Sequence, residues 1–193
     1  AHITNPQTKR QIAFGIANAL EQLTLGRFVH GDVKPQNVLI SNTFEAKVCD
    51  FGLARLRGKT SSVVASETTA GVEGTGEKGH AGGTPAYMAP ELLDSAVASE
   101  KTDVYSFGVL LNELVSEEEP YSDSYAFMKG KGVYAAALLA KEGRRPKILE
   151  TTCPALRDLI SSCWDQDPNK RPTFSFIVCE LMKSNLIFPK MVV

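Results

Sequence analysis

The stretch HGDVKPQN, residues 30–37, places an aspartate, a lysine and an asparagine within six residues of one another. A carboxylate such as Asp32 can accept a proton or orient a hydroxyl group. The ammonium group of Lys34 can offset negative charge, and the amide oxygen of Asn37 is a ligand that Mg²⁺ accepts. Polar loops also supply such groups by chance, so the surrounding sequence has to decide between an active site and a surface loop.

The residues on either side of this stretch predict a helix and a small β-ribbon. Asn5 followed by Pro6 is typical of a helix start, and apolar residues then recur at helical spacing over 6–26. Two short apolar strands are predicted at 38–40 and 46–49, joined by a polar turn. The ribbon would hold the quoted loop on rigid backbone.

The rest of the chain predicts a mainly helical domain. Residues 102–115 are apolar on nearly all sides, which indicates a helix buried at the centre of its domain. Further helices are predicted at 124–141, 154–164 and 172–184. Residues 57–84 are about half glycine, serine and threonine, which is typical of a long loop with a function of its own or without fixed structure.

Composition limits the class of protein. The chain has 193 residues and a net charge of −1, which gives no support for a nucleic-acid or membrane-surface partner. No apolar run approaches the roughly 20 residues that span a bilayer. The four cysteines are scattered and form no CxxC pair, which fits a reducing compartment and predicts a cytoplasmic location, or the intracellular side of a receptor-like chain. The acidic run in SEEEPYSD, residues 116–123, is interpreted as a solvated loop.

Two further motifs follow the quoted stretch in a fixed order. DFG stands at residues 50–52, thirteen positions after Asn37, and APE stands at 89–91 behind GGTPAYM. A loop with Asp and Asn, then DFG, then APE is the motif order of protein kinases. The segments KTDVYSFGVLLNEL (101–114) and CWDQDPNKRPTF (163–174) extend the similarity over essentially the whole chain.

The sequence therefore resembles the C-terminal lobe of a protein kinase catalytic domain, within the tyrosine-kinase-like group of serine/threonine kinases. The resemblance implies a mainly α fold, with a helical bundle around a buried central helix and a small β-ribbon at the active site. It makes residues 1–193 a C-terminal lobe, residues 30–37 the catalytic loop and residues 50–91 the activation segment.

The resemblance also assigns roles in phosphoryl transfer from ATP. Asp32 would accept or orient the proton of the substrate hydroxyl, and Lys34 would offset charge on the transferring phosphate. Asn37 and Asp50 would supply oxygen ligands to Mg²⁺, with Mn²⁺ as an alternative ion. Asp32, Lys34 and Asn37 are the expected catalytic residues, and Lys34, Asn37 and Asp50 are expected to contact the nucleotide and its metal.

Six further residues are expected to support this site. His30 and Phe51 are expected to pack in the core as members of a stacked apolar column, and Gly52 to allow a sharp turn after Asp50. The remaining three would act through polar contacts: Glu91 and Arg171 as a buried ion pair, and Asp103 as an acceptor for the backbone of the catalytic loop.

Two positions predict the substrate class. Serine/threonine kinases carry a lysine two residues after the catalytic aspartate, as Lys34 follows Asp32. Thr84 resembles the threonine that hydrogen-bonds these two residues in kinases of that type and would help to position the substrate. The expected partners are ATP and a protein with a serine or threonine acceptor.

Gly31 departs from the family pattern, because kinases usually have an arginine before the catalytic aspartate. That arginine pairs with a phosphate on the activation segment, which a glycine cannot do. The hypothesis is that phosphorylation in the loop does not act through the usual arginine. The hydroxyl groups available there are Thr60, Ser61, Ser62, Ser66, Thr68, Thr69 and Thr75.

Two alternatives stand beside a protein kinase. No glycine-rich loop, strand lysine or glutamate-bearing helix of an N-terminal lobe is recognisable, so the chain alone is expected to bind Mg-ATP weakly and to catalyse little. It could instead act as a binding or scaffold module. Small-molecule kinases resembling aminoglycoside phosphotransferases share the histidine-glycine-aspartate sequence, but they lack DFG and APE, which favours the protein kinase.

Overall fold

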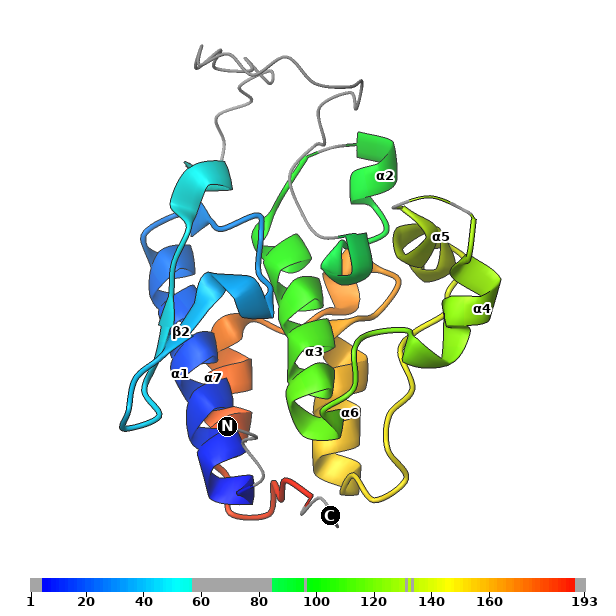
Figure 1. Ribbon diagram of the computed structural model, residues 1–193. Coiled ribbons are helices and arrows are strands. Elements are labelled where there is room, and N and C mark those ends of the chain that lie inside the picture. Colours follow the sequence, from blue (N-terminus) through cyan, green and yellow to red (C-terminus); the bar gives the residue numbers. More distant parts are fainter. Residues whose placement is uncertain (1–4, 57–84, 96, 131, 133, 190–193) are drawn as a thin grey trace.

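The computed structural model describes residues 5–56, 85–95, 97–130, 132 and 134–189. Its elements form one helical body with two small antiparallel strand pairs at its edge (Figure 1). In chain order they are α1 (Pro6–Leu25), β1 (Phe28–Val29), η1 (Pro35–Asn37), β2 (Val38–Ile40), β3 (Ala46–Val48), η2 (Phe51–Leu53), β4 (Arg55–Leu56), η3 (Pro85–Tyr87), α2 (Leu92–Ser95), α3 (Glu100–Ser116), η4 (Ser122–Ser124), α4 (Tyr125–Met128), α5 (Ala135–Lys141), α6 (Pro154–Cys163), η5 (Pro168–Lys170) and α7 (Phe174–Met182).

Helix α1 begins where the sequence predicts. The side chain of Asn5 accepts a hydrogen bond from the backbone N–H of Gln7 at 2.8 Å, and Pro6 occupies the first helical position. One face of the helix is buried, and that face includes Ile12, Ile16 and Leu20. This face packs against α3, and a neighbouring one packs against α7.

Helix α3 is the centre of the lobe, as predicted. Ser99 and Thr102 form a reciprocal capping box at its start, which satisfies backbone donors that a helix end otherwise leaves unpaired. Figure 1 shows α1, α7, α3 and α6 running side by side, with α3 between α1 and α6. Most of α3 is buried, so the predicted mainly α fold around a buried central helix is confirmed.

Helices α6 and α7 pack against the helices described above: α6 lies against α3, and α7 lies against α1. The rings of Phe107 on α3 and Phe174 on α7 meet edge to face, with centroids 5.9 Å apart. Arg10 on α1 donates hydrogen bonds to the carbonyl oxygens of Leu181 and Lys183, both at 2.7 Å. These bonds satisfy carbonyl groups at the C-terminal end of α7 and tie the two helices together.

The predicted ribbon is present as the β2–β3 pair. Val38 pairs with Val48 and Ile40 with Ala46, in antiparallel register. A second pair, in which β1 lies against β4, is not predicted by the sequence. Each of those strands has only two residues, which is too short for the alternating pattern that identifies a strand.

The single helix predicted over 124–141 is wrong. The structure has η4, the one-turn helix α4 and the separate helix α5 in this stretch. Gly130 and Gly132 both have φ of +79°, a left-handed conformation that a continuous right-handed helix excludes. The apolar residues of the two segments fall at helical spacing, so this spacing does not reveal the break between α4 and α5.

Several predictions fall on residues that lie outside the described ones. The loop 57–84 is among them, and so are Thr84 and the seven hydroxyl residues between Thr60 and Thr75. Within the described part of the chain, no helix is both long and apolar enough to cross a membrane.

Candidate active site

The side chains of Asp32, Lys34 and Asn37 come together at the catalytic loop. Asp32 Oδ2 accepts a hydrogen bond from Asn37 Nδ2 at 2.9 Å and lies 2.7 Å from Lys34 Nζ. Asn37 Nδ2 also donates to the backbone oxygen of Asp32 at 2.8 Å. Both contacts fall on one carboxylate oxygen, so Oδ1 of Asp32 has no partner among the described residues and can accept a proton from a substrate.

Asp103, at the start of α3, holds this loop in place through the backbone of the loop. Its two carboxylate oxygens accept the backbone N–H groups of His30, at 2.7 Å, and Gly31, at 2.8 Å. Burial raises the pKa of Asp103 to about 6, although the two backbone bonds favour the charged form. Because its acceptor geometry needs both oxygens free, the ionised carboxylate is the form that holds the loop.

His30 links the catalytic loop to the segment before DFG. Its Nδ1 accepts the backbone N–H of Asp32 at 3.2 Å, so Nδ1 carries no proton. Its Nε2 lies 3.0 Å from the backbone oxygen of Cys49, to which it therefore donates. His30 is buried, as expected, and its ring orients two chain segments relative to each other.

The β2–β3 register brings Asn37 and Asp50 to the same end of the ribbon. The backbone N–H of Cys49 donates to the oxygen of Asn37 at 2.9 Å, directly before Asp50. Asn37 Oδ1 has no donor among the described residues, because Nδ2 makes the hydrogen bonds to Asp32. A free amide oxygen and an exposed carboxylate are the hard oxygen ligands that Mg²⁺ prefers, so these residues fit that ion.

The described residues contain no group of three or more histidine, cysteine, aspartate or glutamate side chains that could hold a metal ion by themselves. Two protein ligands are sufficient where phosphate oxygens and water complete the coordination of Mg²⁺. Asn37 and Asp50 therefore suit a metal that arrives with a nucleotide better than a permanently bound metal.

The DFG segment differs from the expectation at two residues. Asp50, not Gly52, has the left-handed backbone, with φ of +61°. Gly52 donates its N–H to Asp50 Oδ1 at 3.2 Å, and a Cβ on Gly52 would come 3.1 Å from that oxygen. Gly52 therefore makes room for the carboxylate, and the left-handed backbone lies two residues earlier, at Asp50.

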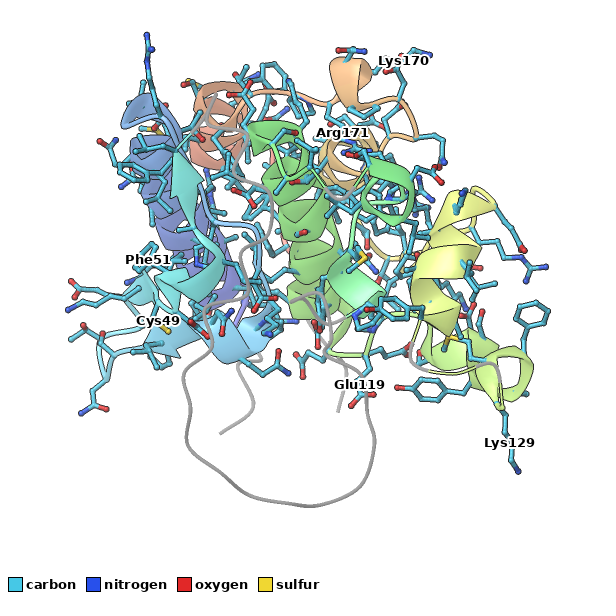
Figure 2. The ribbon with its side chains drawn as sticks, turned by 90° about the horizontal axis from the view of Figure 1, so that it is seen from above. Cys49, Phe51, Glu119, Lys129, Lys170 and Arg171 are labelled. Carbon is cyan, nitrogen blue, oxygen red and sulfur yellow. The ribbon has the colours of Figure 1, made fainter. Side chains whose placement is uncertain are left out.

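Phe51 does not pack in the core, so that prediction is wrong. Its side chain is 50% exposed and lies at the outer edge of the molecule in Figure 2. The ring contacts His30, with centroids 5.3 Å apart and the two ring planes tilted by 55°. The described residues therefore leave half of the Phe51 surface exposed.

Glu91 and Arg171 form an ion pair with two parallel hydrogen bonds. Arg171 Nη1 lies 2.6 Å from Oε1 of Glu91, and Nη2 lies 2.9 Å from Oε2. Arg171 also donates to the backbone oxygens of Asp165 and Lys101, both at 2.9 Å, and lies over the Tyr105 ring. Figure 2 shows Arg171 inside the helical body, so the pair fastens the end of the APE motif to the core.

The sequence interpretation overlooked several polar residues, on α1, on α3 and in a cavity beside the catalytic loop. Lys9 is completely buried on α1 and pairs with Glu117 at 2.8 Å, at the C-terminal end of α3. Glu113 interrupts an otherwise apolar stretch of α3. A charge at such a position is the feature of the sequence that could have identified Glu113 as a residue of interest. Tyr87 donates to it at 2.6 Å inside a cavity. Glu119 lines the same cavity and is exposed, as expected for a residue of an acidic run in a solvated loop.

The helical lobe and the loop that joins Asp32, Lys34 and Asn37 are features of the protein kinase class. The family model described as protein tyrosine and serine/threonine kinase matches residues 1–181. The chain belongs to this family.

The relatives of the chain carry kinase names of more than one specificity. A protein kinase and PP2C-like domain-containing protein of Oryza sativa subsp. japonica is 35% identical over 192 residues, which cover 92% of this chain and 29% of that protein. The dual specificity protein kinase shkA of Dictyostelium discoideum is 36% identical over 154 residues, covering 80% of this chain and 26% of that protein. The probable serine/threonine-protein kinase SIS8 of Arabidopsis thaliana is 37% identical over 155 residues, which cover 80% of this chain and 13% of that protein. The chain thus spans less than a third of each of these relatives.

Proposed function

We propose that this chain is the C-terminal lobe of a protein serine/threonine kinase, which transfers the γ-phosphoryl group of ATP to a protein hydroxyl within a complete kinase domain. The observation that carries the proposal is the geometry at Asp32. One carboxylate oxygen is held by Lys34 and Asn37, and the other is free to accept a proton. A fixed carboxylate with one open oxygen suits a residue that orients an attacking hydroxyl.

In the proposed reaction the hydroxyl oxygen of the substrate forms a bond to the γ-phosphorus as the bond from that phosphorus to the β–γ bridging oxygen breaks. The hydroxyl proton goes to Asp32, and ADP leaves with the electron pair of the broken bond. Lys34 lies beside Asp32, where an ammonium group can offset charge on the transferring phosphoryl group. Asp103 keeps the loop in place through the backbone of His30 and Gly31.

Asn37 and Asp50 would hold Mg²⁺, with Mn²⁺ as an alternative ion. The metal, when bound with ATP, would neutralise phosphate charge and orient the phosphates. The donor set supports this role, because both residues present oxygen atoms and come from the same end of the β2–β3 ribbon.

Serine/threonine specificity rests on Lys34 and on Thr84, which lies outside the described residues. The position of Lys34, two residues after Asp32, supports this assignment, and its ammonium group lies 2.7 Å from Asp32 Oδ2. Because relatives include both serine/threonine and dual specificity kinases, the direct measurement is a peptide array with serine, threonine and tyrosine acceptors. Phosphorylation of tyrosine peptides alone would refute the serine/threonine assignment.

The test of the whole proposal is Asp32→Asn in the full-length protein. The amide keeps the size of the side chain but cannot accept the proton, so kcat should fall by roughly 10²- to 10⁴-fold. Asp158→Asn, an exposed change on α6, is the matched control and should leave kcat unchanged. If Asp32→Asn retained full activity, Asp32 would not be the proton acceptor.

The same experiment addresses the scaffold alternative. A full-length protein that binds a protein partner but transfers no phosphate, whatever the residue at position 32, would be a binding module. A cytoplasmic location is part of the kinase proposal, since ATP and reduced cysteines both belong to that compartment.

A further inference from the structure

The guanidinium group of Arg145 lies where the C-terminal ends of two helices meet the central helix. Its Nε donates to the backbone oxygen of Trp164, directly after α6, and its Nη1 donates to that of Ala140, in the last turn of α5, both at 2.9 Å. Its Nη2 donates to Oε1 of Gln166 at 2.7 Å. The same group lies over the ring of Tyr105 on α3, 5.2 Å from the ring centroid. One side chain therefore joins α5 to both α3 and α6.

Neutral acceptors hold Arg145, in contrast to the other cation at this ring. The guanidinium of Arg171 lies 5.0 Å from the centroid of Tyr105 and pairs with Glu91. The ion pairs within the described part of the chain do not include Arg145. Carbonyl oxygens at helix C-terminal ends carry partial negative charge, and a guanidinium group presents several donors in one plane. The contacts of Arg145 therefore fix the relative positions of helices and do not neutralise a carboxylate.

The position of α5 depends on such contacts. The helix has seven residues, too few to be stable in water on its own. Figure 1 shows α5 on the same side of the body as α2, and Lys141 of α5 pairs with Asp94 of α2 at 2.5 Å. Both of those side chains are exposed, so the pair contributes little. Arg145 joins α5 to interior partners instead, since Tyr105 and Trp164 are both buried.

Helix α5 in turn supports η3, the segment that leads into the APE motif. Ala86 of η3 packs against a small apolar cluster that includes Ala136 and Leu139 of α5. Ala86 also lines one cavity together with Gln36 of the catalytic loop, so η3 lies beside that loop. Thr84, which is expected to position the substrate, directly precedes η3. A displacement of α5 would therefore shift the surface that borders the catalytic loop.

We propose that Arg145 is a positioning residue for the protein substrate, because it holds α5 against α3 and α6 and thereby keeps η3 in place beside the catalytic loop. This inference rests on the proposed kinase function, which makes η3 part of the surface that a protein contacts when its hydroxyl group reaches Asp32. The contacts of Asp32 and Lys34 within the described part of the chain do not include Arg145. Loss of Arg145 should therefore weaken binding of the protein substrate and leave ATP binding and the rate of transfer nearly unchanged.

The test is Arg145→Met in the full-length protein, assayed with the peptide that the wild type phosphorylates fastest in the array. The KM for the peptide should rise by about 3- to 10-fold, while kcat and the KM for ATP stay within about twofold of the wild type. A merely structural role would reduce the amount of folded enzyme, which lowers the apparent kcat at an unchanged peptide KM. Arg144→Met is the matched control, because Arg144 is the exposed neighbour with the same charge and its guanidinium lies over the Phe127 ring. Its peptide KM should equal that of the wild type.

Arg145→Lys carries the test if Arg145→Met does not fold. Lysine keeps the charge, but its single nitrogen cannot reproduce the planar set of donors, so the peptide KM should rise in the same direction by a smaller factor. Hydrogen exchange in η3 gives a readout that does not need catalysis. The N–H of Met88, which donates to the backbone oxygen of Pro85 at 3.3 Å, should exchange faster in the Arg145 variants than in Arg144→Met.

The outcomes separate this proposal from the kinase function. A peptide KM that stays at the wild-type value in active Arg145 variants, or that rises equally in Arg144→Met, overturns the positioning role and leaves the kinase function intact. A fall in kcat at an unchanged peptide KM overturns it as well. If the wild type phosphorylated no peptide, the kinase function would fail and the exchange of η3 would decide the role of Arg145: faster exchange in its variants supports that role, and unchanged exchange overturns it.

Discussion

Gly31 donates its backbone N–H to Oδ1 of Asp103 across 2.8 Å, although the two residues stand 72 positions apart. The second oxygen of Asp103 accepts the N–H of His30 at 2.7 Å. One buried carboxylate on the central helix thus fixes two consecutive peptide groups just before Asp32. The position of Asp32, the proposed proton acceptor, depends on this anchor, so changes at Asp103 should affect activity without direct contact with a substrate.

Asp103→Asn should lower activity with little change in the fold. Asparagine has one acceptor oxygen, and its NH₂ group would face the N–H of either His30 or Gly31. A buried donor without a partner costs about 1–3 kcal/mol, which corresponds to a loss in kcat of roughly 5- to 150-fold if the cost falls on the catalytic loop. Peptide kinase assays of the full-length protein measure the loss.

Circular dichroism should show the same helix content in the Asp103→Asn variant as in the wild type. Asp158→Asn, which removes an exposed carboxylate from α6, is the control and should keep full activity. Equal kcat for the wild type and Asp103→Asn would mean that the loop does not need this anchor.

Asp103 should also give stability an unusual dependence on pH. Its pKa is about 6 in the folded chain, against an ordinary value of 3.8, because burial penalises the charge. The folded state therefore binds the extra proton, so this residue contributes stability below pH 6 that is lost as the pH rises through 6. In denaturant unfolding at pH 5, 6 and 7, the wild type should lose stability relative to Asp103→Asn as the pH increases. If NMR showed that the carboxyl group of Asp103 titrates below pH 4 in the folded chain, the expected loss of stability between pH 5 and pH 7 would be contradicted.

Gly31→Ala should destabilise the chain by about 1 kcal/mol. Gly31 has φ of +79°, a conformation that costs an L-residue roughly 1–2 kcal/mol. The added Cβ would lie 3.4 Å from the backbone oxygen of Leu53, an ordinary contact, so the cost comes from the backbone and not from a clash. The midpoint of thermal unfolding should fall by about 2–4 °C. An unchanged midpoint would show that the loop tolerates a side chain here.

Much of the fold could be predicted from the sequence, because its strongest signals are local. The cap at Asn5 and the apolar character of α3 both depend on neighbouring residues, and both appear where predicted. The break between α4 and α5 could not be predicted from apolar spacing, since the backbone of Gly130 and Gly132 decides it. The β1–β4 pair joins two-residue strands that are far apart in sequence, and no local pattern marks it.

In the candidate site, too, some features could be predicted from the local sequence and others depend on the tertiary structure. Motifs indicated Asp32, Lys34, Asn37 and Asp50, because phosphoryl transfer requires particular chemical groups at particular spacings. The exposure of Phe51 and the position of Glu119 in a cavity wall depend on which elements surround them. Such tertiary surroundings leave no trace in the local sequence, which is why Phe51 was expected in the core and why the cavity beside the acidic run was not predicted.

Glu91→Gln should cost about 2–3 kcal/mol of folding stability. The change leaves the guanidinium of Arg171, which is 2% exposed, without a charged partner. Breaking a buried pair typically costs 3–5 kcal/mol, and the partial exposure of Glu91 reduces that value. The double variant Glu91→Gln with Arg171→Met should recover part of the loss, because it removes the unpaired charge. If the two changes were additive in denaturant unfolding, the pair would not be coupled.

Activity should survive the removal of every candidate phosphorylation site in the loop 57–84 that precedes Thr84. With glycine at position 31, no arginine precedes Asp32 to bind a phosphate on that segment. Alanine at Thr60, Ser61, Ser62, Ser66, Thr68, Thr69 and Thr75 together should change kcat/KM by no more than a few-fold. Phosphatase-treated wild-type protein is the control, since it keeps the hydroxyl groups but carries no phosphate, and it should match the untreated protein. Loss of activity in both samples would show that a loop phosphate acts through another cation. Loss in the alanine variant alone would instead assign a role to the hydroxyl groups themselves.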